Sequence, residues 1–120
     1  MGYASALGYA ATLAASAVIQ EELPSTPVRD ASELYENCTA KELDRGMQCY
    51  AFIGGVIDGY YLGSGLAEAP LVFCMPDQTT MRESRKVVVD FMKRRPDALN
   101  RQAAVVVLTA LKEGYPCAKK

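Results

Sequence analysis

Histidine is absent from this chain of 120 residues, and its absence excludes several kinds of site. A serine or cysteine nucleophile normally needs a histidine base, so the common hydrolase mechanisms are excluded. The four cysteines form no Cys-x-x-Cys pair, and a zinc site would need these scattered thiolates to converge without imidazole ligands. No glycine-rich phosphate loop follows a predicted strand. The sequence therefore predicts a protein that is not an enzyme and that uses no metal or cofactor.

An excess of charge of either sign is also missing, because 13 basic residues face 14 acidic ones and the formal net charge is −1. No overall field would attract nucleic acid or an anionic membrane. One basic cluster, Lys93-Arg94-Arg95, lies at a predicted helix end, where cations complement the helix dipole. The other is Lys119-Lys120. We expect neither nucleic acid nor a membrane as a partner.

The first 19 residues carry no charged side chain, and Ala15-Ser16-Ala17 has the small-x-small pattern of a signal-peptidase site. We predict a signal peptide over 1–17, a proline-containing linker over 18–29 and an exported helical domain over 30–118. No Lys or Arg precedes the apolar run, so either the true start lies upstream or the α-amino group supplies the positive charge. An alanine-rich helix retained on the domain is the alternative, and a membrane-spanning anchor is less favoured.

The cysteines are Cys38, Cys49, Cys74 and Cys117, an even number in a short chain with an export-like leader. This pattern favours two disulfides over buried free thiols or a redox or metal role. Three pairings are possible. We favour Cys74–Cys117, which would join the open end of one helical hairpin, and Cys38–Cys49, which would join the other hairpin across its turn. The main competitor pairs Cys38 with Cys117 and Cys49 with Cys74.

Apolar periodicity predicts an all-α fold, a small four-helix domain with one longer loop over 63–76. The first two helices are expected over 30–38 and 42–62, the second being ended by Gly63-Ser64-Gly65. Thr80 and Glu83 have the spacing of a capping box for the third helix, in which Met81 and Ser84 face inward and the Ser84 hydroxyl bonds back to the preceding turn. Pro96 ends that helix, and the fourth begins at the Asp97 cap, carries Leu99 on its buried face and ends near Gly114 and Pro116.

The helix over 42–62 has a wide apolar face, which is typical of the central helix of a bundle. Gly54, Gly55 and Gly59 predict a groove for close packing of another helix, and the alternative is a kink or stop near Gly54. Asp58 is expected to make a buried structural hydrogen bond rather than to act in catalysis. The residues expected on the buried stripe are Leu43, Met47, Tyr50, Ile53 or Gly54, Ile57 and Tyr61.

Aromatic residues crowd this helix, and such stripes are usually core. Tyr60 and Tyr61, followed by Gly63-Ser64-Gly65, are also placed where a protein interface could form, since tyrosine is favoured at interfaces.

Four motifs in order resemble the Rap/Tai immunity proteins, which protect bacteria against type VI secretion amidase toxins. Residues 49–58, Cys-Tyr-Ala-Phe-Ile-Gly-Gly-Val-Ile-Asp, are similar to the family pattern Cys-x-Gly-Tyr-Ile-x-Gly-Val-x-Asp, with Ala51 and Phe52 in place of Gly-Tyr. Phe73-Cys74-Met75-Pro76, then Pro96-Asp97, and a terminal Ala-Leu followed by Tyr115-Pro116-Cys117 complete the resemblance. It covers about residues 30–118.

The resemblance implies a periplasmic, helical, non-catalytic inhibitor that binds a secreted peptidoglycan amidase, in several cases as a homodimer. A small periplasmic chaperone or stress protein and an envelope-assembly subunit are the alternative functions. The residues predicted to bind the partner are Tyr60, Tyr61, Gly63, Ser64, Gly65 and Glu68. Those predicted to serve the structure are Gly55, Asp58, Pro76, Pro96 and Pro116.

Overall fold

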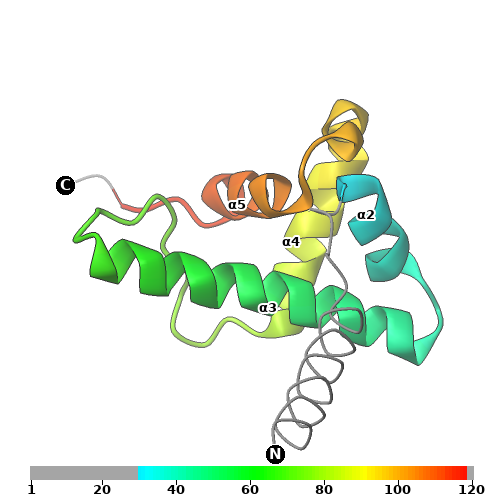
Figure 1. Cartoon of the computed structure of the whole chain (residues 1–120), viewed down its shortest axis with the longest axis horizontal. Helices are drawn as coiled ribbons and strands as arrows, with labels where there is room; N and C mark the ends of the chain where they lie inside the picture. Colours follow the sequence, from blue (N-terminus) through cyan, green and yellow to red (C-terminus); the bar gives the residue numbers. More distant parts are fainter. Residues whose placement is uncertain (1–29, 119–120) are drawn as a thin grey trace, which may run out of the picture.

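A computed structural model describes residues 30–118 and shows four α-helices and one short 3-10 helix (Figure 1). Within this range no β-strand forms, and the only β-type pairing is an isolated bridge between Asp30 and Gln102. The predicted all-α class is therefore confirmed, whereas the predicted signal peptide and the linker lie outside the described residues. The elements are α2 (Ala31–Thr39), α3 (Leu43–Leu66), α4 (Met81–Arg94), η1 (Pro96–Asn100) and α5 (Ala103–Gly114).

The core lies where α2, α4 and α5 meet α3, and apolar side chains from all four helices are buried there. The capping box predicted for α4 is present: the Glu83 backbone N–H donates to the Thr80 hydroxyl (3.2 Å), and the Thr80 N–H donates to the Glu83 carboxylate (2.8 Å). These bonds satisfy N–H groups that the first turn of a helix otherwise leaves unpaired. The largest fully buried side chains are Phe73, Ile53, Met92, Leu111, Val88, Val107, Cys49 and Ser84.

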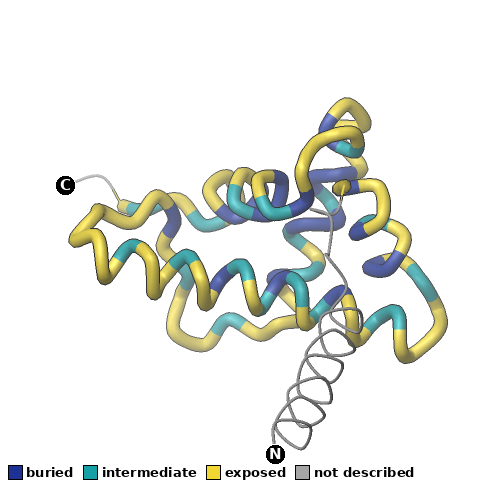
Figure 2. The backbone as a smooth tube through the Cα atoms, in the orientation of Figure 1, coloured by how far each residue is buried: buried dark blue, intermediate teal, exposed yellow. Residues whose placement is uncertain are grey.

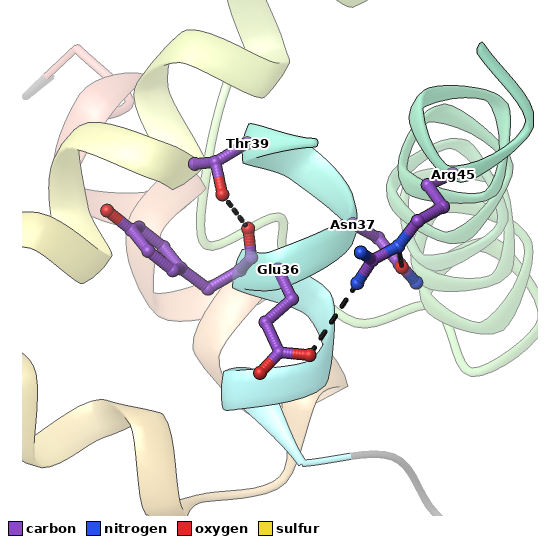
Figure 3. A network of polar contacts seen from close by, with 5 residues as sticks. Glu36, Asn37, Thr39 and Arg45 are labelled. Carbon is purple, nitrogen blue, oxygen red and sulfur yellow. Dashed lines mark hydrogen bonds and ion pairs between the residues drawn. The ribbon is translucent and has the colours of Figure 1, made fainter. Parts of the chain in front are cut away.

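Both favoured disulfides are confirmed: Cys38 pairs with Cys49, and Cys74 pairs with Cys117. The first joins the end of α2 to α3 across their short connection. Arg45 of α3 strengthens the same junction, since its Nε donates to Asn37 Oδ1 (3.1 Å) and its guanidinium lies 3.6 Å from the Glu36 carboxylate (Figure 3). Asn37 is buried, so this hydrogen bond satisfies a side chain that would be costly to leave unpaired.

The second disulfide attaches the segment after α3 to the C-terminal segment. Beside it, the Cys74 backbone N–H donates to the Tyr115 carbonyl (2.8 Å). Phe73, next to the bridge, is fully buried. Phe73 therefore attaches this segment to the core, and the bridge fixes its end.

α3 is longer than predicted, and the glycines at 63 and 65 lie inside it rather than ending it. It has 24 residues, which gives a length of about 36 Å. Its buried residues are Cys49, Ile53 and Ile57. The prediction was wrong for Leu43 and Met47, which are 80% and 62% exposed, because α3 begins before the other helices cover it.

The predicted glycine groove is also wrong. A Cβ at Gly55 or Gly59 would meet no atom within 4 Å, and one at Gly54 would meet only the flexible Met81 side chain, at 3.7 Å. Gly55 and Gly59 have open surroundings, and Gly54 is approached only by the side chain of Met81 at the start of α4, so the three glycines form no groove for close helix packing. Asp58 is exposed, which contradicts its predicted burial.

Three further predictions failed around α4 and α5. The segment that follows Pro96 forms the 3-10 helix η1, so α5 begins only at Ala103 and Leu99 is not on its buried face. Met81 is 38% exposed. Ser84 is fully buried as expected, but its hydroxyl has no hydrogen-bond partner among the described residues.

Candidate partner-binding site

We call residues 60–72 the α3 tip. Figure 1 shows that the last turns of α3 and the loop after them extend beyond the end of α5, at one end of the molecule. Figure 2 shows that most of this end is exposed. All six residues predicted to bind a partner lie in the α3 tip, and Glu68 is its only charged residue.

Aromatic side chains connect the α3 tip to the core. The Tyr60 ring stacks on the buried Phe73 ring with 4.7 Å between centroids, and the Tyr61 ring meets Phe73 edge-on at 5.7 Å. The Tyr60 hydroxyl accepts a hydrogen bond from the Val72 backbone N–H (2.6 Å). Tyr60 therefore positions the returning loop against α3, while Tyr61 is 36% exposed and presents part of its ring to solvent.

α3 ends in a Schellman motif centred on Glu68. The Ala69 N–H donates to the Ser64 carbonyl (2.9 Å), and the Glu68 N–H donates to the Gly65 carbonyl (3.3 Å). Glu68 takes the left-handed conformation that this motif requires, with φ of 51°, and it is the only described non-glycine residue with positive φ. Glycine usually occupies such a position because a Cβ atom is unfavourable there. Residues held in such conformations are often found at functional sites.

Large apolar side chains are exposed on the α3 tip. Leu66 is 80% exposed and Leu62 66%, and they lie one helical turn apart on α3. Leu71 and Val72 on the returning loop are also exposed. An exposed apolar group of this kind usually marks a binding surface.

The sequence interpretation missed these four residues. Leu62 and Leu66 are off the stripe that contains Ile53 and Ile57, and this offset was the available signal. Of the residues that were predicted, Gly63, Gly65 and Glu68 are exposed and Ser64 is half-buried. The two glycines have no neighbour within 4 Å of an added Cβ, so their surroundings would accept larger side chains.

The α3 tip offers little for catalysis. Nowhere in residues 30–118 do three or more His, Cys, Asp or Glu residues come close enough to hold a metal ion. The carboxyl groups whose pKa values are lowered, Asp90 and Glu113, belong to α4 and α5. A hydrogen bond from Lys86 lowers the pKa of Asp90, and one from Arg94 lowers that of Glu113. The arrangement of the α3 tip is suited to contact with another protein through apolar surface.

Comparison with known proteins adds one match. The family model of the Rap1a immunity proteins matches residues 30–117. No curated protein and no solved structure matches the chain. Across residues 30–118, none of the helices has both the length and the apolar character needed to cross a bilayer.

Proposed function

Because this chain belongs to the Rap1a immunity proteins, we propose that it is an exported, periplasmic inhibitor of a peptidoglycan amidase toxin delivered by type VI secretion. The family match over 30–117 is the observation that carries the proposal, since an immunity role implies a toxin partner. The inhibitor acts by occupying the toxin and performs no chemistry of its own. Residues 1–17 direct export and are removed, which leaves the linker 18–29 and the helical domain.

The α3 tip is the surface that contacts the toxin in this proposal. Its exposed apolar side chains lose solvent on docking, which favours association by about 25 cal/mol per Å² of apolar area. Three features hold it in place before docking: the Cys74–Cys117 bridge, the Tyr60–Phe73 stack and the Schellman motif at Glu68. A surface ordered in advance loses less conformational entropy when it binds.

Export is supported by the two disulfides, because such bridges persist in oxidising compartments. The described residues contain no free cysteine. In the cytoplasm the same bridges would be kept reduced.

We include a homodimer in the proposal. Leu43 and Met47 are exposed at the start of α3, at the opposite end of that helix from the α3 tip. A pair of copies that buried these side chains would leave both tips open to toxin. Multi-angle light scattering should show a dimer that becomes a monomer in a Leu43→Gln, Met47→Gln variant.

The direct test uses the product of an amidase-like gene adjacent to the gene for this chain. The mature protein, begun at Val18, should co-purify with that product and block its release of soluble fragments from peptidoglycan at equimolar ratio. Leu62→Ser combined with Leu66→Ser should weaken the complex at least tenfold. Val105→Ser is the matched control, because Val105 is an exposed apolar residue on α5. Absence of any complex with such a neighbour would count against the amidase assignment, and equal loss in both variants would count against the tip.

The chaperone alternative predicts a different result. A chaperone would protect many unrelated clients from aggregation, whereas an immunity protein should protect none of them. Light-scattering assays with several heat-denatured enzymes separate the two, and general protection would overturn the proposal.

A further inference from the structure

A groove of about 670 Å³ runs along α4 where the end of α2 approaches it. Its apolar side is formed by Val89 and by Cys38, whose bridge to Cys49 holds α2 in place. The remaining lining is mostly cationic. The residues that line this basic groove are Cys38, Thr39, Arg82, Arg85, Lys86, Val89, Asp90 and Lys93.

The cations of the basic groove are only partly neutralised. Asp90 is the one carboxylate among the lining residues, and its partner is Lys86, at 2.8 Å. The Arg85 guanidinium lies over the Tyr50 ring, 5.1 Å from its centroid. The side chains of Arg82 and Lys93 make no ion pair or hydrogen bond with any other residue in 30–118. The groove therefore holds a local positive charge on a chain whose net charge is −1.

The pKa of Asp90 also indicates positive charge around the basic groove. The hydrogen bond from Lys86 is the largest influence on Asp90, and the charges of Lys93 and Arg94 also lower its pKa. A carboxylate in this region is thus stabilised by more cations than the one it touches. An added carboxylate near Lys93 would be attracted by the same cations.

We propose that the basic groove binds an acidic, extended peptide segment of a partner protein. Arg82 and Lys93 are eleven residues apart on α4, so they are separated by about 16 Å. A peptide in extended conformation covers that distance with about five residues at roughly 3.3 Å each. Successive side chains of such a segment point to opposite sides, so Asp or Glu at every second position would face the cations while the intervening side chains point to solvent.

The basic groove is separate from the α3 tip. Its wall contains Cys38, which is bonded to Cys49, and Cys49 precedes Leu66 by 17 residues of α3, or about 26 Å. A toxin bound at the tip would leave the groove open. The inference thus stands independently of the proposed function.

The test is fluorescence anisotropy at low salt with a labelled eight-residue peptide that alternates Glu and Ala, compared with its Gln-for-Glu counterpart. Arg82→Gln with Lys93→Gln should weaken binding of the Glu peptide about tenfold, since an exposed charge pair contributes roughly threefold each. The control, Arg101→Gln with Lys112→Gln, removes the same charge from exposed positions outside the groove and should change binding less than twofold. Thermal unfolding checks that both variants fold.

Several results would overturn the proposal. These are no binding of the Glu peptide, equal binding of the Gln peptide, equal losses in the two variants, and binding of phosphatidylglycerol vesicles that the Glu peptide cannot displace. A salt-sensitive dimer that the Arg82→Gln, Lys93→Gln change abolishes would identify a second copy as the occupant and also overturn it. Loss of binding in raised salt, where charges are screened, is required for support.

Discussion

Replacing Glu68 with glycine should stabilise this protein, although glycine usually weakens a folded chain. Glu68 occupies the left-handed position that ends α3, with φ of 51°. An L-residue in this conformation costs about 1–2 kcal/mol, and glycine removes that cost. Glycine also makes the unfolded chain more flexible, and this entropy stabilises the unfolded state by about 0.5–1 kcal/mol. The midpoints of these two ranges leave a gain of about 0.75 kcal/mol in the free energy of unfolding.

Two matched variants isolate this effect. Ala67, the preceding residue, has φ of −86° and ψ of −3°, so Ala67→Gly gains no relief and should lose about 0.5–1 kcal/mol. Glu68→Ala removes the carboxylate but keeps the left-handed Cβ, so its stability should stay within about 0.3 kcal/mol of the original.

Urea unfolding followed by circular dichroism measures all three variants, and the two glycine variants should differ in sign. In thermal unfolding, Glu68→Gly should raise Tm by about 2–6 °C. If Glu68→Gly lost as much stability as Ala67→Gly, the reasoning about the end of α3 would be refuted. Toxin binding measured on Glu68→Ala then reports the role of the carboxylate separately from the backbone.

Three other predictions concern stability. Replacing Cys74 and Cys117 with alanine opens a loop with a sequence separation of 43, which should lower the free energy of unfolding in urea by about 4 kcal/mol. A loss below about 2 kcal/mol would mean that packing alone holds the segment after α3 in place. Ser84→Ala removes a buried hydroxyl without a partner among the described residues, so stability should rise by about 1 kcal/mol in the same assay; a clear decrease would show that the hydroxyl is satisfied. The hydrogen bond from Arg94 lowers the pKa of Glu113 below its usual 4.5. The contribution of this pair to stability is therefore present above pH 4.5 and is lost as the pH falls through the folded-state pKa. The difference in free energy of unfolding between the original chain and Arg94→Gln should shrink on acidification, and an unchanged difference would contradict the assignment.

Much of the fold could be predicted because local signals agreed with it. The Thr80 and Glu83 spacing located the start of α4, and the order of the cysteines along the expected helical hairpins favoured the pairing that the structure has. The stripe through Ile53 and Ile57 located the buried face of α3. The capping box and the Cys38–Cys49 bridge join residues close in sequence, and the stripe follows from helix periodicity. The Cys74–Cys117 pairing spans a sequence separation of 43 and followed from the expectation that both cysteines lie at the open end of one helical hairpin.

The errors came from features that depend on the environment of a residue. Gly63 and Gly65 were expected to end α3, yet a helix can contain glycines where nothing crowds them, and the left-handed residue that ends it is a glutamate. Leu43 was expected to be buried because it fits the stripe, but periodicity does not reveal how far along α3 the other helices extend. Asp58 was expected inside because it lies between Ile57 and Gly59 in the central helix, but it is exposed. The tip was located by its tyrosines, whereas Leu62 and Leu66 were missed although their offset from the buried stripe was visible in the sequence.

The uncovered end of α3 has a consequence for how such a chain can diverge. Side chains such as Leu62 and Leu66 contribute almost nothing to the buried core, so exchanging them should leave the scaffold as stable as before. Binding specificity could therefore change through successive single substitutions in the α3 tip, because none of them would lower the stability of the fold. Related chains could therefore follow changes in a toxin by substitutions at the α3 tip while the helical core stays unchanged.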